Sequence, residues 1–169
     1  MRKIYCDIRK CLSCYSCEVA CALCHSKSND IYQAAHETPR PKHLVRVNKS
    51  DWGPFPLRCH HCEDAPCIDA CKSGATHRDP ETGKVLIDRD KCVGCWMCVM
   101  VCPFGAVSPD YETGTAIKCD LCEGHEKPAC AEACPTNALY FVEYEDFEKE
   151  YKKQKPEKII VSSSERSGL

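Results

Sequence analysis

Apolar and polar residues alternate only over short stretches of this chain, and turn-forming residues stand next to these stretches. Residues 84–88 (KVLID) and 114–118 (GTAIK) follow the two-residue period that predicts short β-strands. The loops that precede them, DPETGK and DYETGT, contain Gly83 and Gly114, which can adopt a positive φ. We therefore expect two hairpins, each ending in one of these strands.

A longer segment, residues 25–58, is too long to be a simple connection and is interpreted as an insertion. Within it, residues 43–49 (HLVRVNK) alternate as a strand does, and residues 51–56 (DWGPFP) predict a turn. Helical patterns are brief. The longest near the cysteines is CEVACALCHS at 17–26, and YEDFEKEYKKQ at 144–154 predicts an amphipathic surface helix. The tail that ends in SSSERSGL is expected to be loose.

Cysteine sets this composition apart. The chain has 169 residues, of which 18 are cysteine, whereas it contains four Phe, two Trp and three Met. Much of the 43% that counts as hydrophobic is therefore cysteine and alanine. A chain of this length with so few bulky apolar residues requires another source of stability, either disulfides or metal.

Disulfides are one alternative, because 18 is an even number. However, the opening residues MRKIYCDIRKCLSC are charged and lack both the apolar run of a secretory signal and a twin-arginine pair. No stretch approaches the roughly 18 apolar residues of a membrane span. We therefore expect a cytoplasmic protein, in which paired cysteines more often indicate metal or redox chemistry. The formal net charge of −2 does not favour a nucleic-acid binder.

Sixteen of the cysteines fall into four motifs with one skeleton: a C-x2-C pair, a third cysteine after a variable gap, and a fourth after three more residues. The motifs are Cys11, Cys14, Cys17 and Cys21; Cys59, Cys62, Cys67 and Cys71; Cys92, Cys95, Cys98 and Cys102; and Cys119, Cys122, Cys130 and Cys134. Proline follows the last cysteine of the third and fourth motifs. Bacterial ferredoxins bind 4Fe–4S clusters through this C-x2-C-x2-C-x3-C-P pattern. The spacing therefore predicts iron–sulfur clusters.

The spacing has a geometric explanation. A loop can wrap three thiolates around three corners of a cubane cluster, and the x3 spacing then starts a helix that directs the fourth cysteine toward another cluster. Zinc is the rival metal, and it commonly uses four tetrahedral ligands from two separated C-x2-C pairs. Zinc does not explain a third and a fourth cysteine within each short motif, so we favour iron–sulfur clusters.

The segments between the motifs also repeat, because each begins with a small-residue turn and an alanine and then extends. We predict an α+β fold of two ferredoxin-like dicluster units, related by an internal pseudo-repeat. One unit is expected to hold the second and third motifs, in residues 59–109. The other is expected to hold the first and fourth, in residues 1–24 and 110–144, which would bring the chain ends together. Residues 25–58 are the insertion, and residues 145–169 are the surface helix and the tail.

Three segments resemble the four-cluster ferredoxin-type subunits that transfer electrons for large redox enzymes. They are FPLRCHHCEDAPCIDAC, CVGCWMCVMVCPFGA and KCDLCEGHEKPACAEACPTNAL, and the resemblance extends over residues 3–144. Members of this family serve molybdenum or tungsten enzymes, hydrogenases, formate dehydrogenases and carbon monoxide dehydrogenases. The opening segment IYCDIRKCLSCYSCEVAC is most similar to the iron–sulfur subunit associated with carbon monoxide dehydrogenase.

In this family the motifs exchange their fourth cysteines, the first with the fourth and the second with the third. The resemblance thus implies four 4Fe–4S clusters. Their ligand sets would be Cys11, Cys14, Cys17 and Cys134; Cys119, Cys122, Cys130 and Cys21; Cys59, Cys62, Cys67 and Cys102; and Cys92, Cys95, Cys98 and Cys71. The chain departs from the family pattern where Lys72 and Ala22 follow fourth cysteines, although Gly74 and Ala75 preserve the turn after Lys72.

Five residues near the motifs have a structural explanation beside a functional one. Cys6 lies in the expected first strand and is interpreted as a buried, unreactive thiol. Cys24 is either a structural residue or a substitute ligand. His60 and His61 could ligate iron as histidines do in Rieske centres, but four cysteines are available, so we expect hydrogen bonding or packing. Trp96 is expected to pack or to shield a cluster from water.

We expect an electron-transfer subunit without a catalytic site, because the chain contains no dinucleotide fingerprint, phosphate loop or nucleophile motif. The expected partners are a large redox enzyme, first of all carbon monoxide dehydrogenase, and a second redox protein such as a hydrogenase or an NAD(P)H–flavin oxidoreductase. One alternative is service to a formate dehydrogenase, a hydrogenase or a molybdenum or tungsten oxidoreductase. Alternatives of another class are an iron–sulfur redox sensor and a self-sufficient enzyme with an open iron site.

Overall fold

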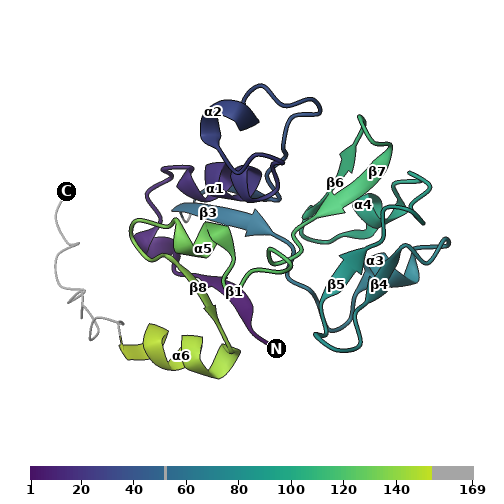
Figure 1. The fold of residues 1–169 in the computed structure, drawn as a ribbon. Coiled ribbons are helices and arrows are strands. Elements are labelled where there is room, and N and C mark those ends of the chain that lie inside the picture. Colours follow the sequence, from purple (N-terminus) through teal and green to yellow (C-terminus); the bar gives the residue numbers. More distant parts are fainter. Residues whose placement is uncertain (52, 154–169) are drawn as a thin grey trace, which may run out of the picture.

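The computed structural model describes residues 1–51 and 53–153. Within them every strand belongs to a two-stranded antiparallel pair, and short helices lie between the pairs (Figure 1). The pairs are β1 (Lys3–Cys6) with β8 (Leu139–Val142), β2 (Val45–Ser50) with β3 (Gly53–Arg58), β4 (Thr76–Arg78) with β5 (Val85–Ile87), and β6 (Val107–Asp110) with β7 (Thr115–Lys118). The predicted α+β class, with short strands and short helices, is confirmed.

The pairing of β1 with β8 joins strands from opposite ends of the described chain. Lys3 lies opposite Val142, and Cys6 lies opposite Leu139. Ile4 and Leu139 are both buried beneath this pair, because alternate residues of a strand face the same side. The first cysteine motif follows β1 and the fourth precedes β8, so the pairing holds these two motifs on one side of the molecule.

The two predicted hairpins are present as β4–β5 and β6–β7. Their loops turn at Gly83 (φ +71°) and Gly114 (φ +70°), in the left-handed region that favours glycine. Val85, Val107 and Ala116 face inward from these hairpins and are buried. The predictions for both loops and for the strands that follow them are therefore confirmed.

The turn predicted for residues 51–56 is wrong over residues 53–56. Gly53–Arg58 forms β3, which is paired with β2 along its whole length. The two prolines of this segment favour a turn in sequence. A two-stranded sheet has free edges, however, and a proline on such an edge removes no hydrogen bond between strands. The strand predicted at residues 43–49 is β2, which begins and ends slightly later.

The helices are short, and they lie beside the cysteine motifs, in the insertion or near the end of the described chain. They are the 3₁₀ helix η1 (Ile8–Lys10), α1 (Ser16–Cys24), α2 (Ile31–Ala34), α3 (Pro66–Asp69), α4 (Met97–Val101), α5 (Ala129–Glu132) and α6 (Tyr144–Lys153). The predicted surface helix is α6, and the predicted loose tail lies outside the described residues. No helix in the two described segments of the chain has the length and apolar character that a membrane span requires.

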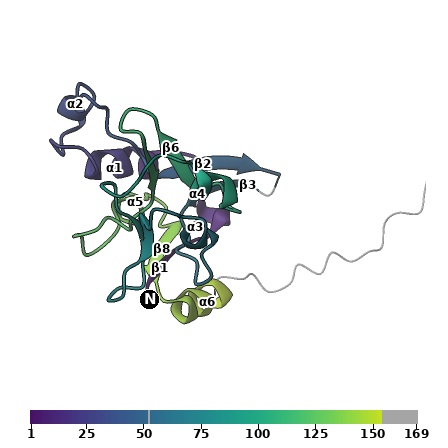
Figure 2. The same cartoon turned by 90° about the vertical axis from the view of Figure 1, so that its right-hand side faces the viewer.

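Aromatic side chains attach α6 to the β1–β8 pair. Phe147 stacks on Tyr5 with ring centroids 4.9 Å apart and meets Tyr140 edge-on at 5.5 Å. The guanidinium carbon of Arg9 lies 4.5 Å from the ring centroid of Tyr151, in a cation–π contact. Figures 1 and 2 show the helix beside β8, at one end of the molecule.

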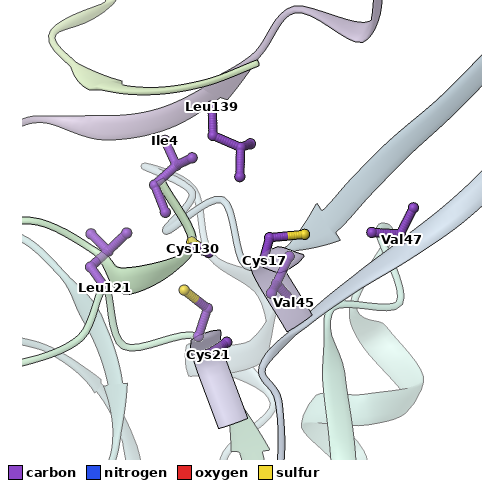
Figure 3. Packing of buried hydrophobic residues seen from close by; sticks show 9 residues of the cluster. Ile4, Cys17, Cys21, Val45, Val47, Leu121, Cys130 and Leu139 are labelled. Atoms are coloured by element: carbon purple, nitrogen blue, oxygen red, sulfur yellow. The ribbon is translucent and has the colours of Figure 1, made fainter. Parts of the chain in front are cut away.

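Cysteines make up a large part of both groups of buried side chains that form the core. The larger group combines aliphatic residues of β1, β2 and β8 with Leu121 and four cysteines (Figure 3). The smaller group consists of Cys98, Val107 and Ala116. The core contains few bulky side chains. Metal groups bound by these cysteines would therefore supply much of the stabilisation that holds the strands together.

Candidate metal centres

One backbone conformation recurs in all four C-x2-C pairs. The residue before the second cysteine has a positive φ in each of them: Ser13 (+54°), His61 (+46°), Gly94 (+66°) and Leu121 (+63°). For residues other than glycine this conformation costs on the order of 1–3 kcal/mol and persists where the surrounding structure requires it. Alternation of right- and left-handed residues turns successive N–H groups toward one point, and such concavities bind anions, iron–sulfur clusters included. The repeated conformation indicates that each pair is shaped for such a group.

A second conformation recurs after the fourth cysteine in three of the motifs. The residue three positions later is left-handed, namely Gly74 (φ +68°), Gly105 (+61°) and Asn137 (+49°). In each case its N–H donates to the carbonyl oxygen of the fourth cysteine, at 3.1–3.2 Å. The turn is therefore preserved after the second motif, although Lys72 stands where proline is common. In the first motif α1 continues through Cys24 instead.

The fourth cysteine of every motif accepts a backbone hydrogen bond at its sulfur. The donors are Thr76 for Cys71 (3.2 Å), Ala106 for Cys102 (3.4 Å), Ala138 for Cys134 (3.2 Å) and Leu44 for Cys21 (3.2 Å). Three of these donors lie four or five residues after their cysteine, within the recurrent turn. Leu44 instead comes from the insertion, so the insertion supplies the hydrogen bond that α1 removes from the first motif.

Three further motif sulfurs accept backbone hydrogen bonds. The donors are His61 for Cys59, Ala116 for Cys92 and Ala129 for Cys122, all at 3.4 Å. Within residues 1–51 and 53–153, no three Cys, His, Asp or Glu side chains converge as the ligands of one metal ion would. Hydrogen bonds to sulfur favour thiolates and adjust the potentials of iron–sulfur clusters. The thiol groups and their N–H donors therefore fit 4Fe–4S clusters.

The same hydrogen bonds lower the pKa of two fourth cysteines. Burial opposes ionisation of Cys71, but the N–H of Thr76 and the hydroxyl of Ser73 outweigh it and lower the pKa of the thiol to about 7. Burial likewise opposes ionisation of Cys134, and hydrogen bonds from Ala138 and other groups again lower its pKa. Both thiols therefore ionise more readily, which favours their action as thiolate ligands.

The second and third motifs lie together in the fold. The pKa of Cys98 is raised by burial and then by Cys92 and Cys71. The pKa of Cys67 is raised by burial and, among its neighbours, by Cys102. The helices of the two motifs, α3 and α4, pack against each other. Cys71 of the second motif thus lies near Cys98 of the third, and Cys102 of the third lies near Cys67 of the second.

Cys21 of the first motif lies beside the fourth motif. Burial raises the pKa of Cys119 to about 12, and Cys21 is among the neighbours that raise it further. The pKa of Cys130 is likewise raised by burial, then by Cys119 and Cys21. Figure 3 shows the sulfurs of Cys21 and Cys130 close together, whereas the sulfur of Cys17 points elsewhere. The packing of α1 against α5 brings these residues together.

Cys134 lies near the first motif. Burial raises the pKa of Cys6 to about 12 against the opposing effect of Arg58, and both Cys11 and Cys134 add to the rise. Thr136 ties the two motifs together, because its hydroxyl donates to the carbonyl oxygen of Lys10 at 2.7 Å. The high pKa keeps Cys6 in the thiol form, which is the less reactive one.

The other residues singled out in the sequence take up packing positions beside the motifs. The Sγ of Cys24 is 3.5 Å from Nε2 of His125, and Cys24 raises the pKa of Cys122 after the larger effect of burial. The ring of His60 packs against that of Phe104, with centroids 4.4 Å apart. A role for Cys24 as a substitute ligand stays a prediction.

His61 and Trp96 have defined partners. Nδ1 of His61 accepts the N–H of Val85 at 3.1 Å, and burial lowers the pKa of the imidazole to about 3. The ring is therefore neutral, with its proton on Nε2. Trp96 adopts φ +61° before α4, packs against the smaller core group and meets Tyr111 edge-on at 5.8 Å.

Sequence reasoning missed a basic residue directly before the first cysteine of every motif. These residues are Lys10, Arg58, Lys91 and Lys118. Arg58 and Lys118 are buried, at 5% and 7% exposed, whereas Lys91 is exposed. Nζ of Lys118 donates to the carbonyl oxygens of Val85 and Cys119. The recurrence is visible in the sequence, but only the fold separates the buried pair from the others.

An ion pair joining the first and fourth motifs was also missed. Nε2 of His25, just after α1, lies 3.1 Å from Oδ1 of Asp120. Asp120 is the first cause of the raised pKa of His25, which reaches about 11. Nδ1 of the imidazolium also donates to the carbonyl oxygen of Cys21 at 2.7 Å. The cation therefore links the carboxyl-terminal end of α1 to the fourth motif.

Comparison with known proteins gives the family of the chain. The 4Fe–4S dicluster domain family matches residues 50–144. The iron–sulfur protein of Rhodospirillum rubrum is 41% identical over 160 residues, which cover 85% of this chain and 83% of that protein. The electron transport protein HydN of Escherichia coli (strain K12) is 38% identical, over 84% of this chain and 88% of its own. The thiosulfate reductase electron transfer subunit PhsB of Salmonella typhi is 34% identical, over 80% and 72% respectively.

The family match covers the second, third and fourth cysteine motifs, and these relatives align with 80–85% of the chain. The cofactors of the chain are 4Fe–4S clusters, and its sixteen motif cysteines are sufficient for four. The chain belongs to the 4Fe–4S dicluster domain family and is an iron–sulfur electron-transfer protein.

Proposed function

We propose that the sixteen motif cysteines hold four 4Fe–4S clusters and that paired motifs exchange their fourth cysteines. Each cluster is named after the motif that supplies three ligands. Cluster I has Cys11, Cys14, Cys17 and Cys134; cluster II has Cys59, Cys62, Cys67 and Cys102; cluster III has Cys92, Cys95, Cys98 and Cys71; and cluster IV has Cys119, Cys122, Cys130 and Cys21. The exchange is supported by the proximity of every fourth cysteine to its partner motif and by the α1–α5 and α3–α4 contacts.

Two dicluster units follow from this assignment, one for clusters I and IV and one for clusters II and III. Because β7 is paired with β6, a boundary between residues 109 and 110 would divide a hairpin. We therefore place the boundary after Lys118. The units then comprise residues 1–24 with 119–144, and residues 59–118.

The order of the sites along the proposed path is I, IV, II, III. Cys59 is among the groups that raise the pKa of Cys119, so the sites of clusters IV and II adjoin. Cys14 and Cys95 are exposed, while the other fourteen motif cysteines are buried or half-buried. These two belong to clusters I and III, which places both ends of the path at the surface. When bound, each cluster accepts and releases one electron.

The residues of the chain hold the clusters, exclude water from them and set their potentials. A backbone N–H that donates to a ligand sulfur stabilises the more negative, reduced state of the cluster, whereas burial of the cluster destabilises that state. Cys21, Cys119, Cys122 and Cys130 are all buried, so the site of cluster IV is the most buried of the four. An electron on cluster IV is therefore shielded from water.

We propose a non-catalytic subunit that docks on a large redox enzyme in the cytoplasm and passes electrons to a second redox protein. The similarity of the opening segment to the subunit of carbon monoxide dehydrogenase supports that enzyme as the first choice. The acceptor would be a hydrogenase or an NAD(P)H–flavin oxidoreductase. PhsB is named as a subunit of thiosulfate reductase, which supports service to another oxidoreductase as the alternative.

The observation that carries the proposal is the placement of each fourth cysteine beside its partner motif. The test is a reductive and oxidative titration of anaerobically purified protein, followed by electron paramagnetic resonance. A conductor takes up and returns about four electrons per chain with no loss of iron. Conversion or loss of a cluster on oxidation would instead indicate a sensor, and turnover by the isolated chain an enzyme. Anaerobic co-purification then identifies the partner.

A further inference from the structure

A buried arginine lies where the two dicluster units meet. Arg58 is the last residue of β3, directly before Cys59, and it is 5% exposed. One NH1 hydrogen bond reaches the carbonyl oxygen of Pro56 at 3.2 Å. The Nε atom is buried and has no hydrogen-bond partner within the described residues. A buried guanidinium remains charged, because its pKa lies far above neutrality, and an unpaired donor on it is costly.

The groups that act on this guanidinium are cysteine sulfurs from three parts of the chain. Burial is the largest influence and lowers the pKa of Arg58, whereas Cys119, Cys130, Cys6 and Cys59 act in the opposite direction, in that order. Cys119 and Cys130 are proposed ligands of cluster IV, and Cys59 is one of cluster II. Cys59, the next residue, packs against the larger core group, which contains Cys119 and Cys130. Arg58 therefore lies at the inner step of the proposed path, beside the proposed ligands of clusters II and IV.

The other buried cation at this place is held differently. Nζ of Lys118 donates to the carbonyl oxygens of Val85 and Cys119, so its hydrogen bonds are used within the protein. Arg58 retains an unused Nε–H donor. A 4Fe–4S cluster with four thiolates is an anion, and its negative charge grows by one on reduction. A nearby fixed cation with a free donor therefore stabilises the reduced form more than the oxidised form.

We propose that Arg58 is a positioning residue for electron transfer, whose charge and free Nε–H raise the reduction potential of cluster IV relative to cluster I. The inference rests on the proposed set of four clusters. An electron arriving from the exposed end at Cys14 would then move toward the inner pair of sites. The basic residue before a motif thus shifts the reduction potential of a nearby cluster strongly where the residue is buried. It shifts that potential weakly where it is exposed, as at Lys91.

The test compares Arg58→Gln, Arg58→Lys and Lys91→Gln in the full chain. Lys91→Gln removes one positive charge from the equivalent position of the third motif, where the side chain is 64% exposed. Iron and sulfide are counted first, and each cluster is then titrated anaerobically with detection by electron paramagnetic resonance. The signal of cluster IV is the one that Cys122→Ser removes.

Arg58→Gln is expected to lower the reduced-to-oxidised ratio of cluster IV at least tenfold at a fixed ambient potential, a shift of about 59 mV for one electron. Arg58→Lys should lower this ratio by less, and Lys91→Gln should leave the ratio of cluster IV unchanged. Fully loaded Arg58 variants with wild-type potentials would overturn the proposal. So would loss of cluster IV alone in both Arg58 variants, since Arg58 would then be a structural residue. Wild-type protein without four clusters would instead refute the proposed function.

Discussion

Gly94, in the third motif, lies against the backbone of Gly114 so closely that a methyl group on Gly94 would overlap the carbonyl oxygen of Gly114. Gly94 also has φ +66°, so two independent restrictions apply to it. The β6–β7 hairpin therefore packs closely against the loop that holds Cys92 and Cys95.

We predict that Gly94→Ala separates this hairpin from the third motif and removes cluster III, which lowers the iron content by about four per chain. Gly105→Ala is the matched control, because Gly105 has φ +61° and open space around it. It carries the backbone strain without the overlap and should retain its iron. Iron analysis after anaerobic reconstitution measures the difference, and equal iron loss in both variants would contradict the prediction.

The exchange of fourth cysteines can be tested at Cys134. We predict that Cys134→Ala damages the cluster that Cys14→Ala also damages, although the two residues lie far apart in sequence. Electron paramagnetic resonance of the two variants should therefore lack the same signal. If Cys134→Ala instead matches Cys122→Ala, the motifs do not exchange ligands. Cys6→Ala is the control and should keep all four signals.

Asp7 is a buried carboxylate whose replacement should weaken the amino-terminal region. It accepts hydrogen bonds from the backbone N–H of Arg9 at 3.1 Å and from the guanidinium at 2.8 Å. We predict that Asp7→Asn lowers the free energy of unfolding by about 1.5–3 kcal/mol. Asp146→Asn, at an exposed pair with Lys149, should cost less than about 0.5 kcal/mol. Anaerobic denaturant titration compares the two variants.

The pH dependence of this effect follows from the pKa of Asp7. The side-chain hydrogen bond from Arg9 lowers that pKa below its ordinary 3.8 in the folded protein. The stabilisation is therefore present above pH 3.8 and is lost only as the pH falls through the lower, folded value. Asp7→Asn should cost the same at pH 6 and at pH 8. A cost that differs between these values would show that another group titrates with Asp7.

The attachment of α6 depends on Phe147, which contacts Tyr5, Tyr140 and Tyr151. We predict that Phe147→Ala lowers the free energy of unfolding by about 2 kcal/mol, because the side chain is half-buried and its ring contacts are lost. Tyr144→Ala, on the same helix but 56% exposed, should cost less. Both variants should keep their clusters, and loss of iron from Phe147→Ala would contradict a purely structural role of the helix.

Local features of the fold could be predicted from the sequence. The hairpins at Gly83 and Gly114 and the helix from Tyr144 depend on patterns within a few residues, and the structure contains them. The prolines of β3 misled the prediction, because their tolerance depends on a free sheet edge that only the fold reveals. Local rules therefore succeed where the deciding contacts are local.

The four C-x2-C motifs could likewise be found in the sequence, but their surroundings could not. The donor to the sulfur of Cys21 is Leu44, from an insertion with no recognisable motif. The ion pair of His25 with Asp120 spans 95 residues. Arg58 resembles Lys91 in its place before a motif, and only packing makes one buried and the other exposed. Sequence spacing thus identifies ligands, whereas their electrostatic environment depends on distant segments.

We propose that the motif cysteines bind four cubane clusters that both stabilise the fold and carry electrons. The most direct test is the iron and acid-labile sulfide content of anaerobically purified protein. We predict roughly sixteen irons and sixteen sulfides per chain, with loss of folded structure when a chelator removes the iron. About four zinc atoms per chain, or cystines without metal, would contradict the account.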